Sequence, residues 1–325
     1  MLPGFVDAHV HGALGTDFGA LGSDPGPAVE HHARHGSTTL VASIATAEPR
    51  TTCDRLRELA PLVRDGALAG LHLEGPFLAA GRRGAHDPAL LRAPDRAAVD
   101  ELLSAADGAL AVVTLAPELP GALDAVRHLT DAGVVVAIGH TEASAEVVGA
   151  AAEAGATLVT HLFNGMPPLH HREPGPVGAA LADPRLSVEL IGDGHHVADL
   201  ALDAARAAAR GRTLLVSDAM AATGLGDGRY RLAGSDVVVT GGVAMLADGS
   251  SLAGSTTPVG GAAQRLLDRG ADPAQVVALT RTAPARVLGL SPEPLGPGSA
   301  ADLVVVERSR ITRTMRKGAW LPSSS

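Results

Sequence analysis

Apolar residues along the chain fall into short runs that alternate with longer, alanine-rich stretches. Most runs are continuously apolar, as expected of parallel strands that are buried on both faces. The eight runs are Phe5–His11, Thr38–Ser43, Ala69–Glu74, Ala111–Ala116, Val134–His140, Thr157–Phe163, Leu186–Ile191 and Thr213–Ser217. The stretches of helical length between them are Ala28–His35, Thr51–Val63, Asp95–Ala106, Leu119–Ala132, Ala143–Ala154 and Asp199–Ala209. This alternation predicts βα units in a parallel sheet, and eight units predict a TIM-like (β/α)8 barrel, although Pro174–Asp183 shows no clear element.

The pattern changes after Asp218, where the barrel units end. The elements expected beyond it are a hairpin at Asp236–Thr240 and Val243–Leu246, helices at Pro258–Asp268 and Pro273–Leu288, and strands at Ala301–Glu307 and Ile311–Met315. We therefore predict a barrel domain over residues 1–290, with a β-hairpin insertion near 229–248. Residues 291–325 are expected to supply the C-terminal strands of a small β domain and to end in a frayed tail at Ser323–Ser325.

Composition and charge narrow the class of protein. The chain has 325 residues, of which 46% are hydrophobic, and this is enough for a sizeable core. The formal net charge of −9 argues against a surface that binds nucleic acid, and the lack of any run of roughly 18 apolar residues predicts no membrane span. Cys53 is the single cysteine, which excludes an intramolecular disulfide and favours a reducing compartment. We therefore expect a cytoplasmic protein without nucleic-acid or membrane partners.

Ionisable residues stand at or just beyond the carboxyl ends of most of the eight runs. On a (β/α)8 barrel these ends form the active-site face. The residues concerned are His9 and His11 in the first run, His72 and Glu74 in the third, His140 in the fifth, His161 in the sixth, Asp193 and His196 after the seventh, and Asp218 after the eighth. Since alternate residues of a strand share one face, His9 and His11 can converge on one point.

Histidine and carboxylate ligands suit zinc or another divalent cation. We predict a first ion at Glu74, His140 and His161, and a second at His9 and His11 with Glu74 bridging. A bound metal lowers the pKa of water to roughly 7, and Asp218 is the best general base for that water. A lone histidine at a strand end is more often structural, and Asp218 alone could cap a helix. The number of such residues at the same end of the barrel favours the metal site.

Longer motifs surround these residues. They are Pro3–Gly12, Gly70–Phe77, Gly84–His86, Gly139–Thr141, Thr160–Met166, Arg172–Gly175, Asp193–His196, Ser217–Met220 and Leu252–Ser255. Together they resemble the amidohydrolase superfamily and, within it, the N-acetylglucosamine-6-phosphate deacetylase family. The His-x-His motif is generic to the superfamily, whereas Leu73–Phe77 followed by Gly84–His86, with His161–Asn164 downstream, is far more specific. The resemblance extends from Leu2 to about Val306.

The resemblance implies a role for each residue that matches a motif. The metal ligands would be Glu74, His140 and His161, and the catalytic acid/base would be Asp218. The sugar and its acetamido group would be contacted by His86 and His196, and Leu252 would form a wall of the acetyl pocket. The phosphate would be bound by Asn164, the Gly165 amide and Arg172. It also implies one or two divalent ions per subunit, zinc or iron among them, and a homodimer in which Arg172 reaches the partner's site. From the residue alone, Arg172 can make forked hydrogen bonds to phosphate, with a solvated loop charge as the alternative.

The chain departs from the family pattern at three places. Gly165 stands where alanine is usual, which preserves the backbone donor. The family varies at His9 and His11, and the presence of both here makes a second ion plausible. Family members also carry strands before Pro3, so we expect a truncated β-sandwich appendage whose strands at Ala301–Met315 leave an exposed edge.

The leading function is hydrolysis of the acetamido group of N-acetylglucosamine 6-phosphate to glucosamine 6-phosphate and acetate, by metal-bound hydroxide with Asp218 as acid/base. One alternative is another amidohydrolase, acting on an N-acyl amino acid or a cyclic amide. A second is a sugar-phosphate sensor or an inactive truncated fragment. The presence of Asp218 and every expected ligand argues against a decayed site.

Overall fold

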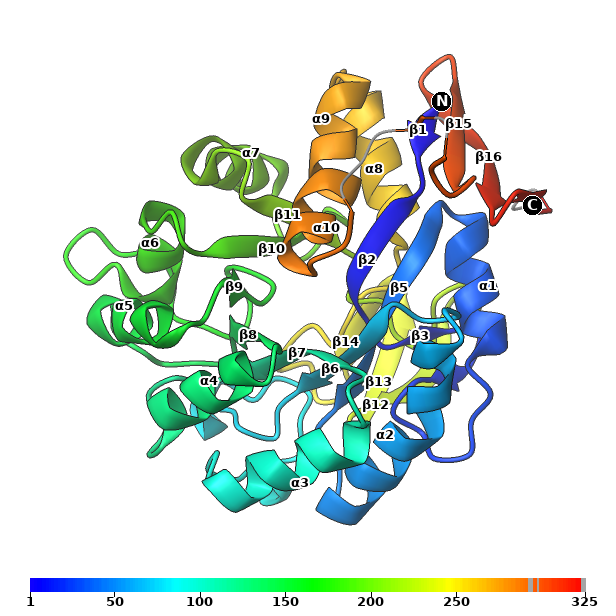
Figure 1. Ribbon diagram of the computed structural model, residues 1–325. Helices are drawn as coiled ribbons and strands as arrows, with labels where there is room; N and C mark the ends of the chain where they lie inside the picture. Colours follow the sequence, from blue (N-terminus) through cyan, green and yellow to red (C-terminus); the bar gives the residue numbers. More distant parts are fainter. Residues whose placement is uncertain (292–294, 297, 323–325) are drawn as a thin grey trace.

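Eight parallel strands form the centre of the computed structural model, which describes residues 1–291, 295–296 and 298–322 (Figure 1). In chain order they are β2 (Phe5–Val10), β5 (Ser37–Ala45), β6 (Gly70–Glu74), β7 (Leu110–Leu115), β8 (Val135–Ile138), β9 (Leu158–Val159), β10 (Ser187–Ile191) and β11 (Thr213–Val216). Each strand pairs with the next in parallel register. Six of them lie within the predicted runs, β5 extends beyond its run at both ends, and β7 begins one residue before its run. The barrel prediction is therefore confirmed.

The barrel closes where its first and last strands meet. The N–H of Asp218 donates to the carbonyl of His9 at 2.9 Å, and the N–H of His11 donates to the carbonyl of Ala219 at 2.8 Å. Below these bonds, the carboxylate of Asp7 accepts a hydrogen bond from the N–H of Ser217 at 3.1 Å. This seam therefore places the ionisable ends of β2 and β11 side by side.

Helices surround the strands, as Figure 1 shows. They are α1 (Gly26–Arg34), α2 (Pro49–Arg64), α3 (Arg96–Ala106), α4 (Ala122–Asp131), α5 (Ala145–Ala154), α6 (Gly175–Ala182), α7 (Asp199–Ala209) and α8 (Val259–Asp268), with short 3₁₀ turns η1 (Ala80–Arg82) and η2 (Pro88–Leu90). Helix α6 occupies the segment that showed no clear element. Its glycines and Pro176 obscure the helical pattern, yet proline is well tolerated in the first turn of a helix.

The predicted helix at Pro273–Leu288 is present but changes its winding. It consists of α9 (Pro273–Val277), a π-helical turn η3 (Ala278–Thr282) and α10 (Ala283–Val287). Pro284 lies just after the π turn. A proline ring clashes with the carbonyl one turn earlier in a regular helix, and the wider turn relieves that clash.

Three smaller antiparallel sheets accompany the barrel. The first consists of β12 (Gly228–Leu232), β13 (Ser235–Thr240) and β14 (Val243–Leu246). The second consists of β3 (Gly12–Ala13) and β4 (Thr16–Asp17). The third consists of β1 (Leu2–Pro3), β15 (Leu303–Glu307), β16 (Arg310–Arg316) and β17 (Ala319–Trp320). The first contains the predicted hairpin and one further strand. It packs against the loops after β6 and β11, because Ala85 and Met220 belong to its apolar cluster.

The expected small β domain corresponds to the third sheet. Leu2 pairs with Val304 and Pro3 with Leu303, so the N-terminal residues form the edge strand beside β15. The expected frayed tail, 323–325, lies outside the described residues. Within the described ranges, no helix has both the length and the apolarity needed to cross a bilayer.

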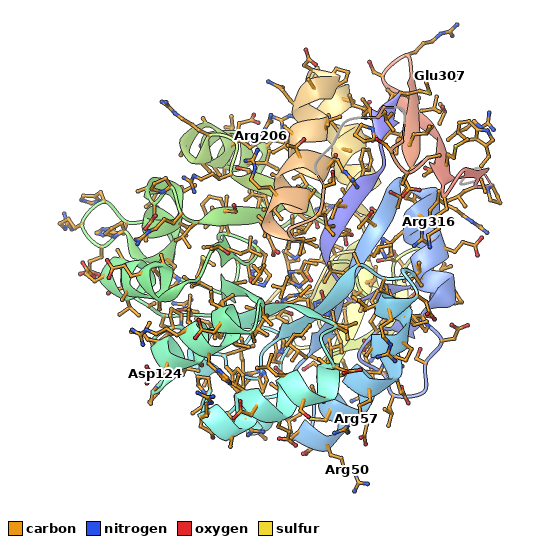
Figure 2. All side chains as sticks on the ribbon, viewed as in Figure 1. Arg50, Arg57, Asp124, Arg206, Glu307 and Arg316 are labelled. Carbon is orange, nitrogen blue, oxygen red and sulfur yellow. The ribbon has the colours of Figure 1, made fainter. Side chains whose placement is uncertain are left out.

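Charged side chains outside the barrel lie mainly at the surface. Figure 2 shows the labelled Arg50 and Asp124 projecting from α2 and α4 away from the barrel, and their side chains are 95% and 88% exposed. The ionisable residues at the barrel mouth are buried instead. Because burial of a charge is costly unless it is paired, this group requires an explanation.

Candidate active site

Three of the expected metal ligands converge at the mouth of the barrel. Glu74 is the last residue of β6, and His140 and His161 lie two residues beyond the ends of β8 and β9. The Nε2 atoms of both histidines lie 3.0 Å from Oε1 of Glu74 and 3.1 Å from each other. All three side chains are buried. The fold therefore gathers three donor atoms from three strand ends around one point.

The other expected ligands form a second cluster next to the first. The Nε2 atoms of His9 and His11 are 3.1 Å apart, and Oδ1 of Asp218 lies 3.5 Å and 3.3 Å from them. Oε2 of Glu74 lies 3.2 Å from Nε2 of His11, while its Oε1 faces the first cluster. Glu74 is thus placed between the two clusters. The residues after Asp218 form a bridge and turns, so the helix-cap alternative does not apply.

The backbone at these positions is unusual. His140, His161 and Asp218 have φ angles of 48°, 27° and 48°, in or near the left-handed region that residues other than glycine seldom adopt. Surrounding contacts hold them there. The Nδ1–H of His140 donates to the carbonyl of Arg82 at 2.7 Å, and the Asp218 backbone is fixed at the barrel seam. Strained conformations of this kind concentrate at functional sites.

The two carboxylates and the imidazoles shift each other's ionisation. Burial raises the pKa of Asp218, but His9 and His11 outweigh it and hold that pKa below its ordinary value. The pKa of Glu74 is held low in the same way, mainly by His9, His11 and His140. Conversely, burial lowers the pKa of His11, but Asp218 and Glu74 outweigh it and raise the pKa to about 9. The carboxylates are therefore ionised and attract positive charge to the centre of the site.

The residues fit a divalent cation. Two imidazole nitrogens 3.1 Å apart repel through their lone pairs unless a proton or a cation lies between them, and this arrangement occurs once in each cluster. The six residues form two groups whose potential ligand atoms lie within 4.8 Å of one another: His9, His11 and Asp218, and Glu74, His140 and His161. Two histidines with one carboxylate is a donor set that catalytic zinc uses.

Cation affinity is expected to depend on pH, because cations and protons compete for the same nitrogens. The pKa of His9, His11 and His140 is raised, so all three retain protons above the ordinary histidine range. Zinc affinity should therefore increase as pH rises from 6 towards about 9, by about tenfold per pH unit for each proton displaced. Competitive zinc titration at several pH values measures this slope, and a flat profile would contradict the assignment of these histidines.

A cavity of about 400 Å³ opens above the two clusters, within the usual size range of small-molecule sites. Five of the six expected substrate-binding residues line it: His86, Asn164, Gly165, His196 and Leu252. Arg172 does not line it and is exposed on the loop before α6. Arg82 is the only arginine or lysine among the described lining residues.

The two expected sugar-binding histidines are fixed in defined orientations. Nδ1 of His86 lies 3.3 Å from the backbone nitrogen of Thr46 and 2.9 Å from its Oγ1. The opposite ring nitrogen, Nε2, faces the Glu74 carboxylate, which can only accept, so Nε2 carries a proton. Nε2 of His86 lies 3.3 Å from Oε2 of Glu74. His196 donates from Nδ1 to Oδ2 of Asp193 at 2.7 Å. Burial lowers the pKa of His196, but Asp193 outweighs it and raises the pKa, which favours a cationic ring.

Gly165 has a local reason to be glycine. Its φ is +62°, and a Cβ atom there would lie 3.0 Å from Nδ1 of His140, closer than normal packing allows. Alanine at this position therefore requires a small displacement of the His140 ring. The glycine lets the backbone approach the first cluster closely.

Sequence reasoning placed Asp193 at the barrel mouth without giving it a role, and the structure shows that it orients His196. Two further residues that support the site were missed. Glu189 contacts residues of both clusters. Asp7 bonds across the barrel seam. The available signal was an acidic residue within an otherwise apolar strand run. His72, in contrast, lies outside both clusters and bonds to hydroxyl groups on neighbouring strands.

An eight-stranded barrel with two histidine–carboxylate clusters at the carboxyl ends of its strands defines a metal-dependent hydrolase. The amidohydrolase family pattern matches residues 1–321. The chain belongs to the amidohydrolase family. This membership accounts for the coincidence of barrel, ligand clusters and acidic residue after the eighth strand.

Similar proteins include several sugar-phosphate deacetylases. N-acetylgalactosamine-6-phosphate deacetylase from Escherichia coli O157:H7 is 39% identical over 94% of this chain and 83% of its own length. N-acetylglucosamine-6-phosphate deacetylase from Homo sapiens is 36% identical over 95% and 80% of the two chains. A mutant of N-acetyl-D-glucosamine-6-phosphate deacetylase from Mycobacterium smegmatis, solved in complex with N-acetyl-D-glucosamine-6-phosphate, has 43% identity and a TM-score of 0.95, covering 98% of this chain and 86% of that chain.

Proposed function

We propose that the chain hydrolyses the acetamido group of N-acetylglucosamine 6-phosphate, giving glucosamine 6-phosphate and acetate. The observation that carries this proposal is the pair of clusters, one containing Glu74 and the other Asp218, at the floor of a cavity of about 400 Å³. The names of the related deacetylases support the choice of a sugar phosphate. An assay of acetate release tests it.

Glu74, His140 and His161 would hold the principal cation, and His9 and His11, with Asp218 nearby, a second one. Zinc suits both donor sets best. Such a cation would supply a water activated at neutral pH and would polarise the acetamido carbonyl. Oε1 of Glu74 lies 3.0 Å from Nε2 of His140 and Oε2 lies 3.2 Å from Nε2 of His11, so Glu74 could help to hold either cation.

Asp218 is the proton carrier. Its carboxylate is ionised, so it accepts a proton from the attacking water as the new C–O bond forms. It then returns that proton to the amide nitrogen as the C–N bond breaks, and the sugar leaves as an amine. Its position beside His9 and His11 keeps Oδ1 within the reacting centre.

His86 and Leu252 fit the acetyl end of the substrate. Nε2 of His86 carries a proton and lies close to Glu74, so it can donate to the carbonyl oxygen as negative charge develops there. Leu252 offers an apolar wall of the cavity to the acetyl methyl group. His196, held by Asp193, is oriented to contact the sugar.

The phosphate end combines residues of two subunits. Asn164 and Gly165 line the cavity of their own chain, whereas Arg172 is exposed and lies outside it. In a homodimer Arg172 reaches the partner's cavity and binds the phosphate with a forked pair of hydrogen bonds.

Arg172→Ala should weaken binding of the 6-phosphate substrate by roughly 1.5–3 kcal/mol, the usual scale for a charged hydrogen bond. The KM for N-acetylglucosamine without phosphate should change little. Arg210→Ala, which removes another exposed arginine, is the matched control and should leave both KM values unchanged. Equal losses for the two substrates would show that Arg172 does not read the phosphate.

Complementation separates the two positions that Arg172 can take. If Arg172 acts across the dimer, co-expression of Arg172→Ala and Asp218→Asn chains creates mixed dimers with one intact site, and activity exceeds that of either variant alone. If Arg172 acts within its own subunit, every site in the mixed dimer stays defective.

A second candidate substrate is N-acetylgalactosamine 6-phosphate, because the 39%-identical relative from Escherichia coli O157:H7 bears that name. The two sugars differ in configuration at one hydroxyl group, and the acetamido and phosphate ends are the same. Comparison of kcat/KM for both sugars distinguishes them. Our proposal predicts the larger value for the glucosamine derivative, and a larger value for the galactosamine derivative would reassign the substrate.

A further inference from the structure

Glu189 is a buried carboxylate inside the barrel. It lies in the middle of β10, between Val188 and Leu190, and only 1% of the residue is exposed. A carboxylate in such surroundings is costly unless hydrogen bonds or opposite charges compensate for its lost hydration. Its contacts therefore indicate why an acidic residue occupies this position.

Both hydrogen bonds of the Glu189 side chain lead to the proposed cation site. Its Oε2 lies 3.1 Å from Nδ1 of His9 and accepts a hydrogen bond from the backbone N–H of His161 at 3.2 Å. His9 belongs to one cluster and His161 to the other. A single oxygen atom of Glu189 thus contacts both clusters from below.

The contact with His9 determines which ring nitrogen is available to a cation. A carboxylate can only accept, so Nδ1 of His9 carries the proton that it donates to Glu189. The lone pair is then on Nε2, which lies 3.1 Å from Nε2 of His11 and 3.5 Å from Oδ1 of Asp218. A carboxylate behind a ligating histidine fixes its tautomer and ring orientation and makes it a better ligand.

The contact with His161 acts on the backbone instead. His161 has a φ of 27°, and its N–H would otherwise lack a strand partner at this turn. Glu189 satisfies that N–H and helps to hold the strained conformation, which directs Nε2 of His161 towards Glu74.

We propose that Glu189 is a positioning residue that determines the cation affinity of the His9–His11–Asp218 cluster through the His9 ring, whereas it contacts the first cluster only at the His161 backbone. This inference rests on the proposed function only in that both clusters bind cations. Glu189 itself contacts neither the substrate cavity nor the principal donor atoms of the first cluster. Its loss should therefore affect the second cation more than the first.

The test is a zinc titration of metal-free protein against a chromophoric chelator. Wild type should bind two equivalents. Glu189→Gln preserves the size of the side chain but removes its charge, and Glu189→Ala removes the contact altogether. In both variants the second equivalent should bind about 10- to 100-fold more weakly, the usual effect of losing a partner behind a metal ligand, while the first stays close to wild type.

Ser187→Ala, on the same strand and half-buried, is the matched control and should titrate like wild type. Thermal unfolding of the metal-free proteins identifies any variant that fails to fold. If Glu189→Ala fails to fold, the isosteric Glu189→Gln still provides the test. Two unchanged equivalents in Glu189→Gln would overturn the inference and leave the proposed function intact. Equal loss of both equivalents, or only one equivalent in wild type, would also overturn the inference. Wild type that binds no zinc would overturn the proposed function as well.

Discussion

Asp218→Asn should lower turnover by roughly a hundredfold or more, the usual scale for acid–base catalysis, while the first cation and the sugar phosphate still bind. Asparagine has nearly the same shape, but it cannot accept the proton of the attacking water or return it to the amine. Steady-state kinetics with N-acetylglucosamine 6-phosphate measures the effect as a fall in kcat with little change in KM.

Asp124→Asn provides the matched control for this result, since Asp124 is an exposed carboxylate on the outer helix α4. It should retain wild-type kcat. Near-native turnover in Asp218→Asn would mean that the proton carrier is another residue, even though Asp218 lies beside both clusters.

His140→Ala should remove the principal cation and abolish turnover. It deletes one of the three donors that the described residues bring to the first cluster, and the remaining pair, Glu74 and His161, cannot hold a cation tightly. Elemental analysis of the purified variant measures the loss. His128→Ala, which removes a histidine paired with Asp100 on the outer helices, should retain both metal and turnover.

Full metal content in His140→Ala would contradict the assignment of the first cluster. Loss of metal in His128→Ala would show instead that the protein releases metal through general destabilisation. The two variants together therefore separate a ligand from a structural histidine.

The barrel could be predicted because its strands are buried on both faces and remain apolar along their length. The parts that sequence reasoning missed lack this signal. Helix α6 has a composition rich in glycine and proline. Strand β12 is only partly buried and alternates arginine with other residues, so its stability comes from pairing with β13.

The two clusters could be located from the sequence because each strand end changes from apolar to ionisable residues, and a barrel brings those ends together. The proposed role of Glu189 could not be predicted from the sequence, since it depends on which face of β10 points inwards and on the register of that strand with β9. The place of Arg172 outside the cavity could not be predicted either, since it depends on the course of the exposed loop before α6.

Acetate release by metal-free and zinc-reconstituted wild-type enzyme tests the central claim most directly. The same preparation is stripped of metal, assayed with N-acetylglucosamine 6-phosphate, and assayed again after addition of zinc. We predict no acetate from the metal-free protein, and equimolar acetate and glucosamine 6-phosphate once the clusters are filled. Full activity in the metal-free protein, or no acetate after zinc has bound, would contradict the account.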